Sequence, residues 1–245
     1  MLTDVKGKVV WITGASSGIG AAAAVALNDA GARVILSGRR QDRLEALAKT
    51  LSGAEVAVLD VADPAAVNAV VAMIINKFER IDILVHSAGL NIKNRAWSDL
   101  SIEDWNTVIQ VDLNGAFYCC QAVLPLMRAQ KDGLIINISS WAGRYVSRVS
   151  GGAYSAAKHA LNAMTESINQ ENCIDGIRAC AICPGEVATE ILDKRPVPVS
   201  AEDRSKMVQA EDLGDLILHV CQTPAHVCLN EITISPTWNR GYIRE

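Results

Sequence analysis

The chain has 245 residues, half of them hydrophobic, which is enough to build one large domain with helices on both faces of a sheet. Its net charge of −4 is spread without a basic cluster, so we expect neither a nucleic-acid partner nor an anionic membrane partner. No transmembrane span or signal peptide is recognisable and the seven cysteines form no CxxC pair, so we expect a cytoplasmic protein. The four histidines show no metal-ligand spacing, so we expect no metal site.

Short β-rich segments alternate with longer helical patterns along the chain. Asp63 before Pro64, and Ser101 further on, are typical helix N-caps, and Pro125 predicts a bend. In chain order we predict a strand at 8–13, helix 18–31, strand 33–37, helix 41–53, strand 55–61, helix 64–79, strand 81–89, helix 102–130, strand 133–139, helix 154–172, strand 177–185, helix 210–222 and strand 231–235.

This alternation predicts the α/β class, with a single Rossmann-type doubly wound domain over residues 1–245 and a seven-stranded parallel sheet covered by helices on both faces. Ligands of such sheets bind beyond the carboxyl ends of the strands. The residues that directly follow each strand are therefore where chemistry is expected.

The stretch "TGASSGIG" lies between the first strand and the first helix. A glycine-rich turn that opens a helix presents free N–H groups and a partial positive charge, so it can bind a pyrophosphate. A plain turn of small residues is the alternative, but the strand before it and the helix after it favour phosphate binding. The candidate residues are Gly14, Ser16, Ser17, Gly18, Ile19 and Gly20.

Six motifs follow one another in order: "TGASSGIG", "LDV", "HSAG", "NIS" continued by Ser140, "YSAAK" and "PGEVAT". Together they resemble the short-chain dehydrogenase/reductase family, and the resemblance covers nearly the whole chain. It implies one nucleotide-binding domain, a nicotinamide cofactor, and oxidoreduction between a carbonyl and an alcohol.

The end of the second strand, "VILSGRRQDRL", indicates which cofactor binds. NAD-preferring sites carry a carboxylate here, but this chain has Gly38 followed by Arg39 and Arg40. A guanidinium binds a 2′-phosphate through paired, charge-assisted hydrogen bonds. We therefore predict NADP(H), with Arg39 as the main contact. The alternative is that both arginines are solvated loop charges.

Tyr154 and Lys158 are four residues apart, so they share one face of a helix. A free phenol has a pKa of about 10, and a neighbouring lysine cation favours the phenolate. The resemblance implies that Tyr154 is the general acid/base and that Lys158 lowers its pKa and binds the nicotinamide ribose. A buried tyrosine beside a solvated lysine is the alternative.

The resemblance also implies a serine at the end of the fifth strand that binds the substrate oxygen. Ser140 is the first choice and Ser139 the second, because the spacing to Tyr154 is one residue longer than usual. Many members hold a relay water with an asparagine in "NLxGxF". Here "VDLNGAF" places Asp112 at that position, where an ionised carboxylate would hold a water as an acceptor.

Further cofactor contacts are implied by the remaining motifs. Asp60 would bind the adenine amino group, the "HSAG" loop would pass the ribose, and "PGEVAT" would meet the nicotinamide carboxamide. His86 is expected to be a packed strand-end residue. The candidate residues are Asp60, Val61, Ser87, Ala88, Gly89, Pro184, Gly185, Val187 and Thr189.

Residues 189–209 are expected to form a short substrate loop, which favours a small substrate. Arg144, Arg148 and Arg195 either face this pocket, where they would suit an anion, or are solvated. The C-terminal stretch "NEITISPTWNRGYIRE" is similar to the branch of the family with serine and 3-hydroxy-acid dehydrogenases and clavulanate dehydrogenase. These features predict a small hydroxy or oxo compound as substrate.

Helix 102–130 carries apolar residues that look exposed, Phe117, Tyr118 and Val123, and the family pairs such helices between subunits. We therefore expect a homodimer or homotetramer. The main prediction is an NADP(H)-dependent dehydrogenase or reductase. The alternatives are an idle NADP-binding redox sensor, which the unusual Asp112 and Ser87 keep open, and an enoyl reductase.

Overall fold

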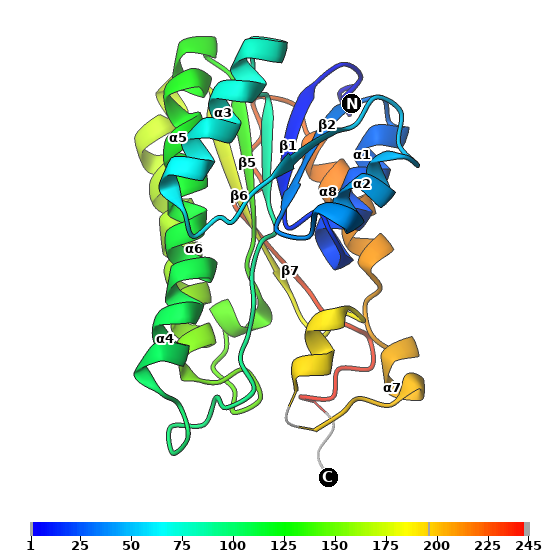
Figure 1. The fold of residues 1–245 in the computed structure, drawn as a ribbon, viewed down its shortest axis with the longest axis vertical. Coiled ribbons are helices and arrows are strands. Elements are labelled where there is room, and N and C mark those ends of the chain that lie inside the picture. The colour runs from blue at the N-terminus through cyan, green and yellow to red at the C-terminus, as the bar shows by residue number, and fades with distance from the viewer. Residues whose placement is uncertain (1, 196, 243–245) are drawn as a thin grey trace.

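Seven strands form one parallel sheet in the order β3-β2-β1-β4-β5-β6-β7 (Figure 1). The structure is a computed structural model that describes residues 2–195 and 197–242. All seven predicted strands are confirmed. They are β1 (Val9–Thr13), β2 (Arg33–Gly38), β3 (Glu55–Val58), β4 (Ile83–His86), β5 (Gly133–Ile138), β6 (Ile177–Pro184) and β7 (Glu231–Ile234).

The strand order reverses between β1 and β4, where the chain has already built β2 and β3 on the other side of β1. The register places Thr13, the last residue of β1, beside His86, the last of β4, and His86 beside Asn137 of β5. The carboxyl ends of the central strands are therefore level. This is the point of an open α/β sheet at which ligands bind.

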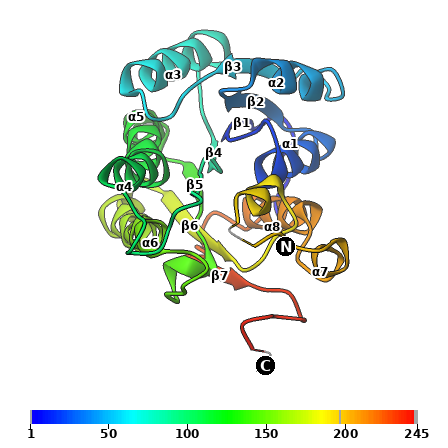
Figure 2. The same cartoon turned by 60° about the horizontal axis from the view of Figure 1, so that its bottom comes forward.

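Two helical layers cover the sheet (Figure 2). Each layer has its own apolar core, as expected for strands that are buried on both faces. One layer consists of α1 (Gly18–Asp29), α2 (Gln41–Ala48) and α8 (Ala210–Cys221), and the other of α3 (Pro64–Phe78), α5 (Gly115–Gln130) and α6 (Gly152–Asn172). A further helix, α4 (Ile102–Ile109), packs on α6.

The predicted caps are present. The Asp63 carboxylate accepts hydrogen bonds from the first turn of α3, and the Ser101 hydroxyl accepts one from the backbone N–H of Asp104 in α4. The predicted helix 102–130 has the right extent, but it is interrupted by a π-helix, η1 (Gln110–Asn114), between α4 and α5. Such a turn holds an extra residue and is common at functional sites.

The apolar surface expected on this helix is smaller than the sequence indicates. Val123 is fully buried in the core, because it lies on the face of α5 that packs on the sheet, so the prediction that it is exposed is wrong. Tyr118 is partly buried, and Phe117 is exposed. In the part of the chain that the structure describes, no helix is both long and apolar enough to cross a membrane.

The segment predicted as the substrate loop contains two short helices, η4 (Glu190–Lys194) and α7 (Ala201–Ser205). Val187 and Val208 form a parallel bridge, and the Ala188 N–H donates to the Val208 carbonyl. The base of the loop is therefore closed by backbone hydrogen bonds. Residue 196, within the predicted range 189–209, lies outside the described residues. The remaining short helices are η2 (Trp141–Gly143) and η3 (Cys173–Asp175).

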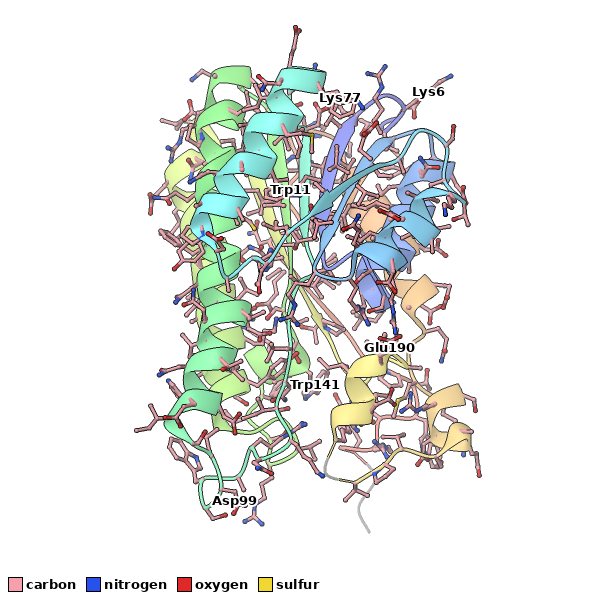
Figure 3. All side chains as sticks on the ribbon, in the orientation of Figure 1. Lys6, Trp11, Lys77, Asp99, Trp141 and Glu190 are labelled. Atoms are coloured by element: carbon pink, nitrogen blue, oxygen red, sulfur yellow. The ribbon has the colours of Figure 1, made fainter. Side chains whose placement is uncertain are left out.

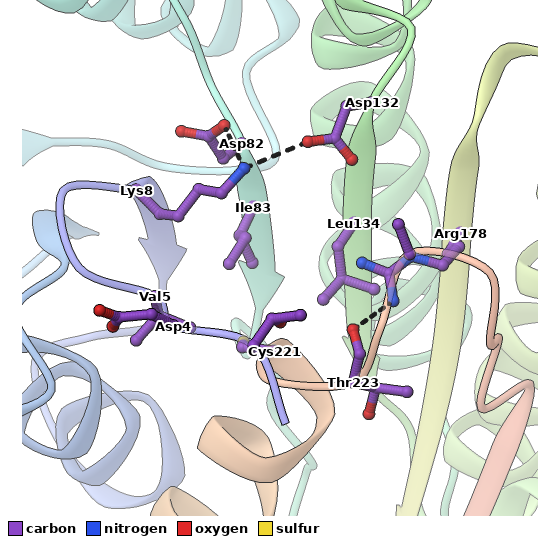
Figure 4. A pocket seen from close by; sticks show the side chains of 12 residues that line it. Asp4, Val5, Lys8, Asp82, Ile83, Asp132, Leu134, Arg178, Cys221 and Thr223 are labelled. Carbon is purple, nitrogen blue, oxygen red and sulfur yellow. Dashed lines mark hydrogen bonds and ion pairs between the residues drawn. The ribbon is translucent and has the colours of Figure 1, made fainter. Parts of the chain in front are cut away.

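A pocket of about 160 Å³ lies at the amino ends of the strands, opposite the ends where chemistry is expected (Figure 4). The Lys8 ammonium bridges two carboxylates there, at 3.2 Å from Asp82 and 3.2 Å from Asp132. Arg80 also pairs with Asp82, which accepts from the backbone N–H of Val9 as well. These charges hold β1, β4 and the start of β5 together, so we interpret this pocket as structural.

Candidate active site

The glycine-rich turn is shaped by close backbone contacts. Gly14 has φ +68°, and a Cβ there would stand 2.7 Å from the backbone of Ser87 and Ala88, so a larger residue does not fit. A Cβ on Gly20 would stand 2.5 Å from the carbonyl oxygen of Gly14. The first turn of α1 therefore lies directly against the loops that follow β1 and β4, with its N–H groups at the carboxyl end of the sheet.

Arg40, rather than Arg39, contacts this turn. Its Nε lies 3.2 Å from Ser16 Oγ, and its Nη2 lies 2.6 Å from Ser17 Oγ. The side chain of Arg39 is 66% exposed and lies 3.9 Å from a carboxylate oxygen of Asp60. The sequence singled out Arg39 as the main contact because it directly follows β2, whereas the structure places the guanidinium of the next residue beside the helix start.

Gly38 lies close to the same turn. A Cβ at this position would stand 3.5 Å from Ser16 Oγ, which is an ordinary contact. A side chain would therefore fit here, and a carboxylate would lie beside the serine hydroxyls and Arg40. Because Gly38 has no side chain, strand β2 places no carboxylate beside the guanidinium of Arg40.

Tyr154 and Lys158 come together on the first turns of α6, as predicted. The Lys158 ammonium lies 5.5 Å from the centre of the Tyr154 ring. The same ammonium lies 3.1 Å from Oδ1 of Asp112 and donates to the carbonyl oxygen of Ile138, also at 3.1 Å. The Asp112 and Lys158 side chains are 0% and 4% exposed, so this is a buried ion pair.

The π-helix η1 brings Asp112 to this position. The Asp112 carboxylate accepts the backbone N–H of Leu90 at 3.1 Å in addition to its contact with Lys158. A Cβ on Gly89 would stand 2.8 Å from Asp112 Oδ1, so the loop after β4 packs tightly against the pair. The relay water at Asp112 stays a prediction, and the structure shows a direct ion pair with the lysine.

The electrostatics differ from the sequence prediction in one respect. Burial raises the pKa of the Tyr154 phenol above its ordinary value; the Lys158 cation acts in the opposite direction, as predicted, and the Asp112 carboxylate adds to the effect of burial. The lysine therefore acts on the phenol in the predicted direction, and the difference is that burial, which the sequence spacing does not show, outweighs it. Burial would lower the pKa of Lys158, but the carboxylate of Asp112 and the phenol of Tyr154 raise it above its usual value.

The structure distinguishes between the two candidate serines. The Ser140 hydroxyl lies near the phenol of Tyr154, where it acts to lower the phenol pKa, and it accepts the backbone N–H of Ala142 at 3.1 Å. Ser139 is buried and donates to the backbone carbonyl of Lys158 at 3.3 Å, on the interior side of α6. Ser140 is therefore the serine beside the phenol.

His86 is packed inside the sheet, as predicted. Its Nδ1 lies 3.0 Å from the hydroxyl of Thr13, and burial together with the nearby Lys158 cation lowers its pKa to about 3. The imidazole is therefore neutral at ordinary pH. The Thr13 hydroxyl also accepts the backbone N–H of Ala88 at 3.3 Å, which fixes the start of the "HSAG" loop.

The remaining predicted contacts surround the same end of the sheet. Asp60 accepts the backbone N–H of Ala62 at 3.0 Å, and Val61 is buried. Gly185 donates its N–H to the carbonyl oxygen of Ile234, which fixes the turn that begins at Pro184. The side chain of Thr189 lies against Gly18, 3.2 Å from where a Cβ of that glycine would stand. The glycine-rich turn and the start of the predicted substrate loop are therefore in contact.

Two of the three arginines proposed for substrate binding have protein partners. Arg195 pairs with Glu186 at 2.6 Å, and Arg144 with Glu231 at 3.2 Å, while Arg148 is exposed. The structure reveals a further arginine near the phenol, Arg95. No motif indicates this residue, because it follows β4 in an irregular loop.

Arg95 is buried and donates to the carbonyl oxygen of Val149 at 2.8 Å. Burial and the cation of Arg195 lower its pKa, and the phenol of Tyr154 acts in the opposite direction. A guanidinium is therefore present near the phenol of Tyr154. Within residues 2–195 and 197–242, no group of three or more metal-ligating side chains is found.

Comparison with known proteins identifies the family. A sequence model described as short chain dehydrogenase matches residues 8–197. The chain belongs to the short-chain dehydrogenase family. This short-chain dehydrogenase is 35% identical to an uncharacterised oxidoreductase of Staphylococcus haemolyticus, over 96% of this chain and 100% of that protein. An uncharacterised oxidoreductase of Staphylococcus aureus is also 35% identical, over 96% of this chain and 99% of the relative.

Solved structures show the same fold. A serine dehydrogenase in complex with NADP⁺ is 31% identical, with a TM-score of 0.85 over 93% of this chain and 94% of the other. An alcohol dehydrogenase of Thermococcus sibiricus, in complex with 5-hydroxy-NADP, is 27% identical with a TM-score of 0.87 over 96% and 99% of the two chains. The short-chain dehydrogenase is therefore an oxidoreductase with the Rossmann-type fold, and its family uses nicotinamide cofactors.

The residues of this chain fit such a cofactor. Gly14 and Gly20 lie where a Cβ would collide with backbone, which leaves a bare backbone surface at the start of α1. The guanidinium of Arg40 and the hydroxyls of Ser16 and Ser17 add donors to that surface. Tyr154 and Lys158 lie at the same edge of the sheet. The loop that begins at Ser87 separates them from the glycine-rich turn.

Proposed function

We propose that this short-chain dehydrogenase transfers a hydride between NADP(H) and a small alcohol or carbonyl compound. The observation that carries the proposal is the group of Tyr154, Lys158 and Ser140, in which the phenol lies near a serine hydroxyl and beside a buried lysine cation. Proton transfer at an oxygen atom that changes charge needs a donor of this kind at a fixed position.

When bound, the nicotinamide ring of NADP(H) supplies or accepts the hydride. The chain supplies the proton and the orientation. Ser140 holds the substrate oxygen with its hydroxyl, and Tyr154 donates its phenolic proton to that oxygen in reduction or removes the proton in oxidation. Lys158 favours the phenolate form through its charge, which opposes the effect of burial. Asp112 acts as a positioning residue, because it holds the ammonium of Lys158 through a buried ion pair.

NADP(H) is proposed rather than NAD(H) because of the residues around the end of β2. Arg40 contacts the hydroxyls of Ser16 and Ser17, and Gly38 leaves out the carboxylate that would repel a 2′-phosphate. Two structures similar to this chain are complexes with NADP⁺ and 5-hydroxy-NADP. Arg40 is proposed as the main 2′-phosphate contact, with Arg39 at the rim.

A small hydroxy acid is the proposed substrate class. One of the similar structures is a serine dehydrogenase, and Arg95 brings positive charge to the end of the site where Tyr154 stands. A carboxylate on the substrate would be attracted there. The loop over residues 189–209 is short and closed at its base by the Val187–Val208 bridge, which suits a small compound.

The test is an assay of absorbance at 340 nm with NADPH and NADH, against a panel of small hydroxy acids, ketones and enones. Turnover of a hydroxy acid or ketone with NADPH is expected. The Tyr154→Phe variant should lose at least a thousandfold in kcat while binding NADPH as the wild type does, because the ring stays and only the hydroxyl is lost. Turnover of enones alone, or full activity of Tyr154→Phe, would refute the proposed chemistry.

We also propose that the chain forms a homo-oligomer through α4 and α5. The exposed aromatic ring of Phe117 stands on α5 beside Tyr118, with ring centres 5.9 Å apart. Aromatic side chains on a helix surface are typical of subunit interfaces. Sedimentation equilibrium is expected to show a dimer or tetramer, and Phe117→Asp should shift it toward monomer; a wild-type monomer at micromolar concentration would contradict the proposal.

A further inference from the structure

Arg40 has a second set of contacts, on the side that faces away from the serines. Its Nη1 lies 2.9 Å from Oε2 of Glu190, and Nη1 of Arg43 lies 2.5 Å from Oε1 of the same carboxylate. Glu190 is the first residue of η4, at the start of the substrate loop. Figure 3 shows it between that loop and the part of the molecule that contains α1 and α2. One carboxylate therefore pairs with two arginines at the end of β2.

We propose that Glu190 is a specificity-determining residue for the cofactor, an internal anion that competes with the 2′-phosphate of NADP(H) for Arg40 and Arg43. A carboxylate and a phosphate present similar oxygen acceptors to a guanidinium, and both bind it through paired hydrogen bonds. The inference rests on the proposed use of NADP(H), since an NAD(H) molecule lacks the 2′-phosphate with which Glu190 would compete.

The exposure of the three side chains makes the exchange favourable. Arg40, Arg43 and Glu190 are 40%, 44% and 52% exposed, and ion pairs in such positions contribute little stability. A phosphate with nearly two negative charges attracts the two arginines more strongly than a single carboxylate does. The arginines hold the pKa of Glu190 below its usual value, so the carboxylate is ionised across the neutral range and competes at full charge.

The position of Glu190 links the two ends of the cofactor site. The preceding residue, Thr189, lies against Gly18 of the glycine-rich turn, and the following residues form η4 of the substrate loop. A 2′-phosphate that takes over the arginines would release the ion pairs by which η4 is tied to α2. Binding of NADP(H), but not of NAD(H), would therefore change the contacts of η4 in the proposed substrate loop.

The experiment measures dissociation constants for NADP⁺ and NAD⁺ by isothermal titration calorimetry. Glu190→Gln should bind NADP⁺ about three- to tenfold more tightly than the wild type, since it removes the competing charge from two exposed ion pairs, and should bind NAD⁺ within twofold of the wild type. Asp193→Asn is the matched control: it removes a carboxylate from the same short helix, but one that pairs with Arg204. It should change neither constant.

Adenosine 2′,5′-bisphosphate locates the effect, because it carries the 2′-phosphate and lacks the nicotinamide. Glu190→Gln should tighten its binding by the same factor as that of NADP⁺, while the binding of adenosine 5′-monophosphate should not change. An unchanged or weaker affinity of Glu190→Gln for NADP⁺, an equal gain in Asp193→Asn, or a gain for NADP⁺ that the bisphosphate does not share would each overturn the inference.

The same titrations separate this inference from the proposed function. If the wild type prefers NAD⁺, the proposed cofactor is wrong. If Arg40→Ala binds NADP⁺ as well as the wild type does, Arg40 is not the contact of the 2′-phosphate. Either result refutes the role of Glu190 as well. If the wild type prefers NADP⁺ and Arg40→Ala loses that preference, but Glu190→Gln gains no affinity, only the competition by Glu190 is refuted.

Discussion

The buried ion pair between Asp112 and Lys158 predicts a strong coupling energy in the free energy of unfolding. The two charged atoms are 3.1 Å apart, and both side chains are almost completely buried. At an effective dielectric constant of about 20, unit charges at this distance attract one another by about 5 kcal/mol. Removing one partner leaves the other charge buried and uncompensated, which costs about 3–5 kcal/mol, whereas removing both charges avoids that penalty.

The measurement is a double-mutant cycle by urea denaturation at pH 7, with Lys158→Met, Asp112→Asn and the double variant. Lys158→Met is expected to lower the free energy of unfolding by about 3–5 kcal/mol. The double variant is expected to lower it by at least about 2 kcal/mol less than the sum of the two single losses. The folded-state pKa of Lys158 is raised, so its contribution is complete below the unfolded pKa near 10.5 and is lost only as the pH rises through the folded value. Additive losses within about 0.5 kcal/mol would refute the reasoning.

The same pair affects the proposed chemistry. Because the Asp112 carboxylate contributes to the raised pKa of Tyr154, Asp112→Asn should lower that pKa. In alcohol oxidation the phenolate is the active form, so the acidic limb of the kcat/KM profile should move to lower pH in the variant. An unchanged limb, or a limb that moves to higher pH, would show that Asp112 does not act on the phenol through its charge.

Three further substitutions test other parts of the site. Gly38→Asp should weaken NADP⁺ binding at least tenfold and spare NAD⁺, because the new carboxylate fits beside Ser16 and repels a 2′-phosphate; equal effects on both cofactors in calorimetry would contradict this. Gly89→Ala should destabilise the fold by about 1–3 kcal/mol in urea, because its Cβ would stand 2.8 Å from Asp112, whereas Gly38→Ala should be nearly neutral. The folded-state pKa of His86 is about 3, below its unfolded value of 6.5. Its contribution to the free energy of unfolding is therefore complete above pH 6.5 and falls by about 1.4 kcal/mol per pH unit toward pH 3. His86→Asn should therefore lose less stability than the wild type between pH 7 and pH 5, by about 2 kcal/mol, and parallel acid curves would refute the assignment.

The sequence predicts the fold well because each element carries its own local signal. Apolar runs and helical periodicity locate all seven strands and the main helices, and the side chains of Asp63 and Ser101 cap their helices as expected. The pairing of Tyr154 with Lys158 also follows from local spacing, since residues four apart share a helix face. These predictions depend on neighbours in the chain, which the sequence displays directly.

What the sequence does not show depends on partners far away in the chain. The carboxylate on Arg40 comes from Glu190, 150 residues further on, and nothing local indicates that Arg40 turns toward Ser16 while Arg39 faces solvent. The net direction of the Tyr154 pKa shift depends on how deeply the ring is buried, which spacing does not reveal. Val123 looked exposed for a related reason, because helix faces can be assigned only once the neighbouring elements are known.

The π-helix at Gln110–Asn114 places one extra residue in the helix that links α4 to α5. A π turn closes over five residues rather than four, so it takes up the extra residue while the helices on either side keep nearly the same phase. Val108 can therefore pack against its apolar neighbours on α6 while Asp112, inside the π turn, reaches Lys158. Deleting one residue here would restore α geometry and redirect the side chains of the turn itself, so the contact between Asp112 and Lys158 is the one that a shorter version of this segment would give up.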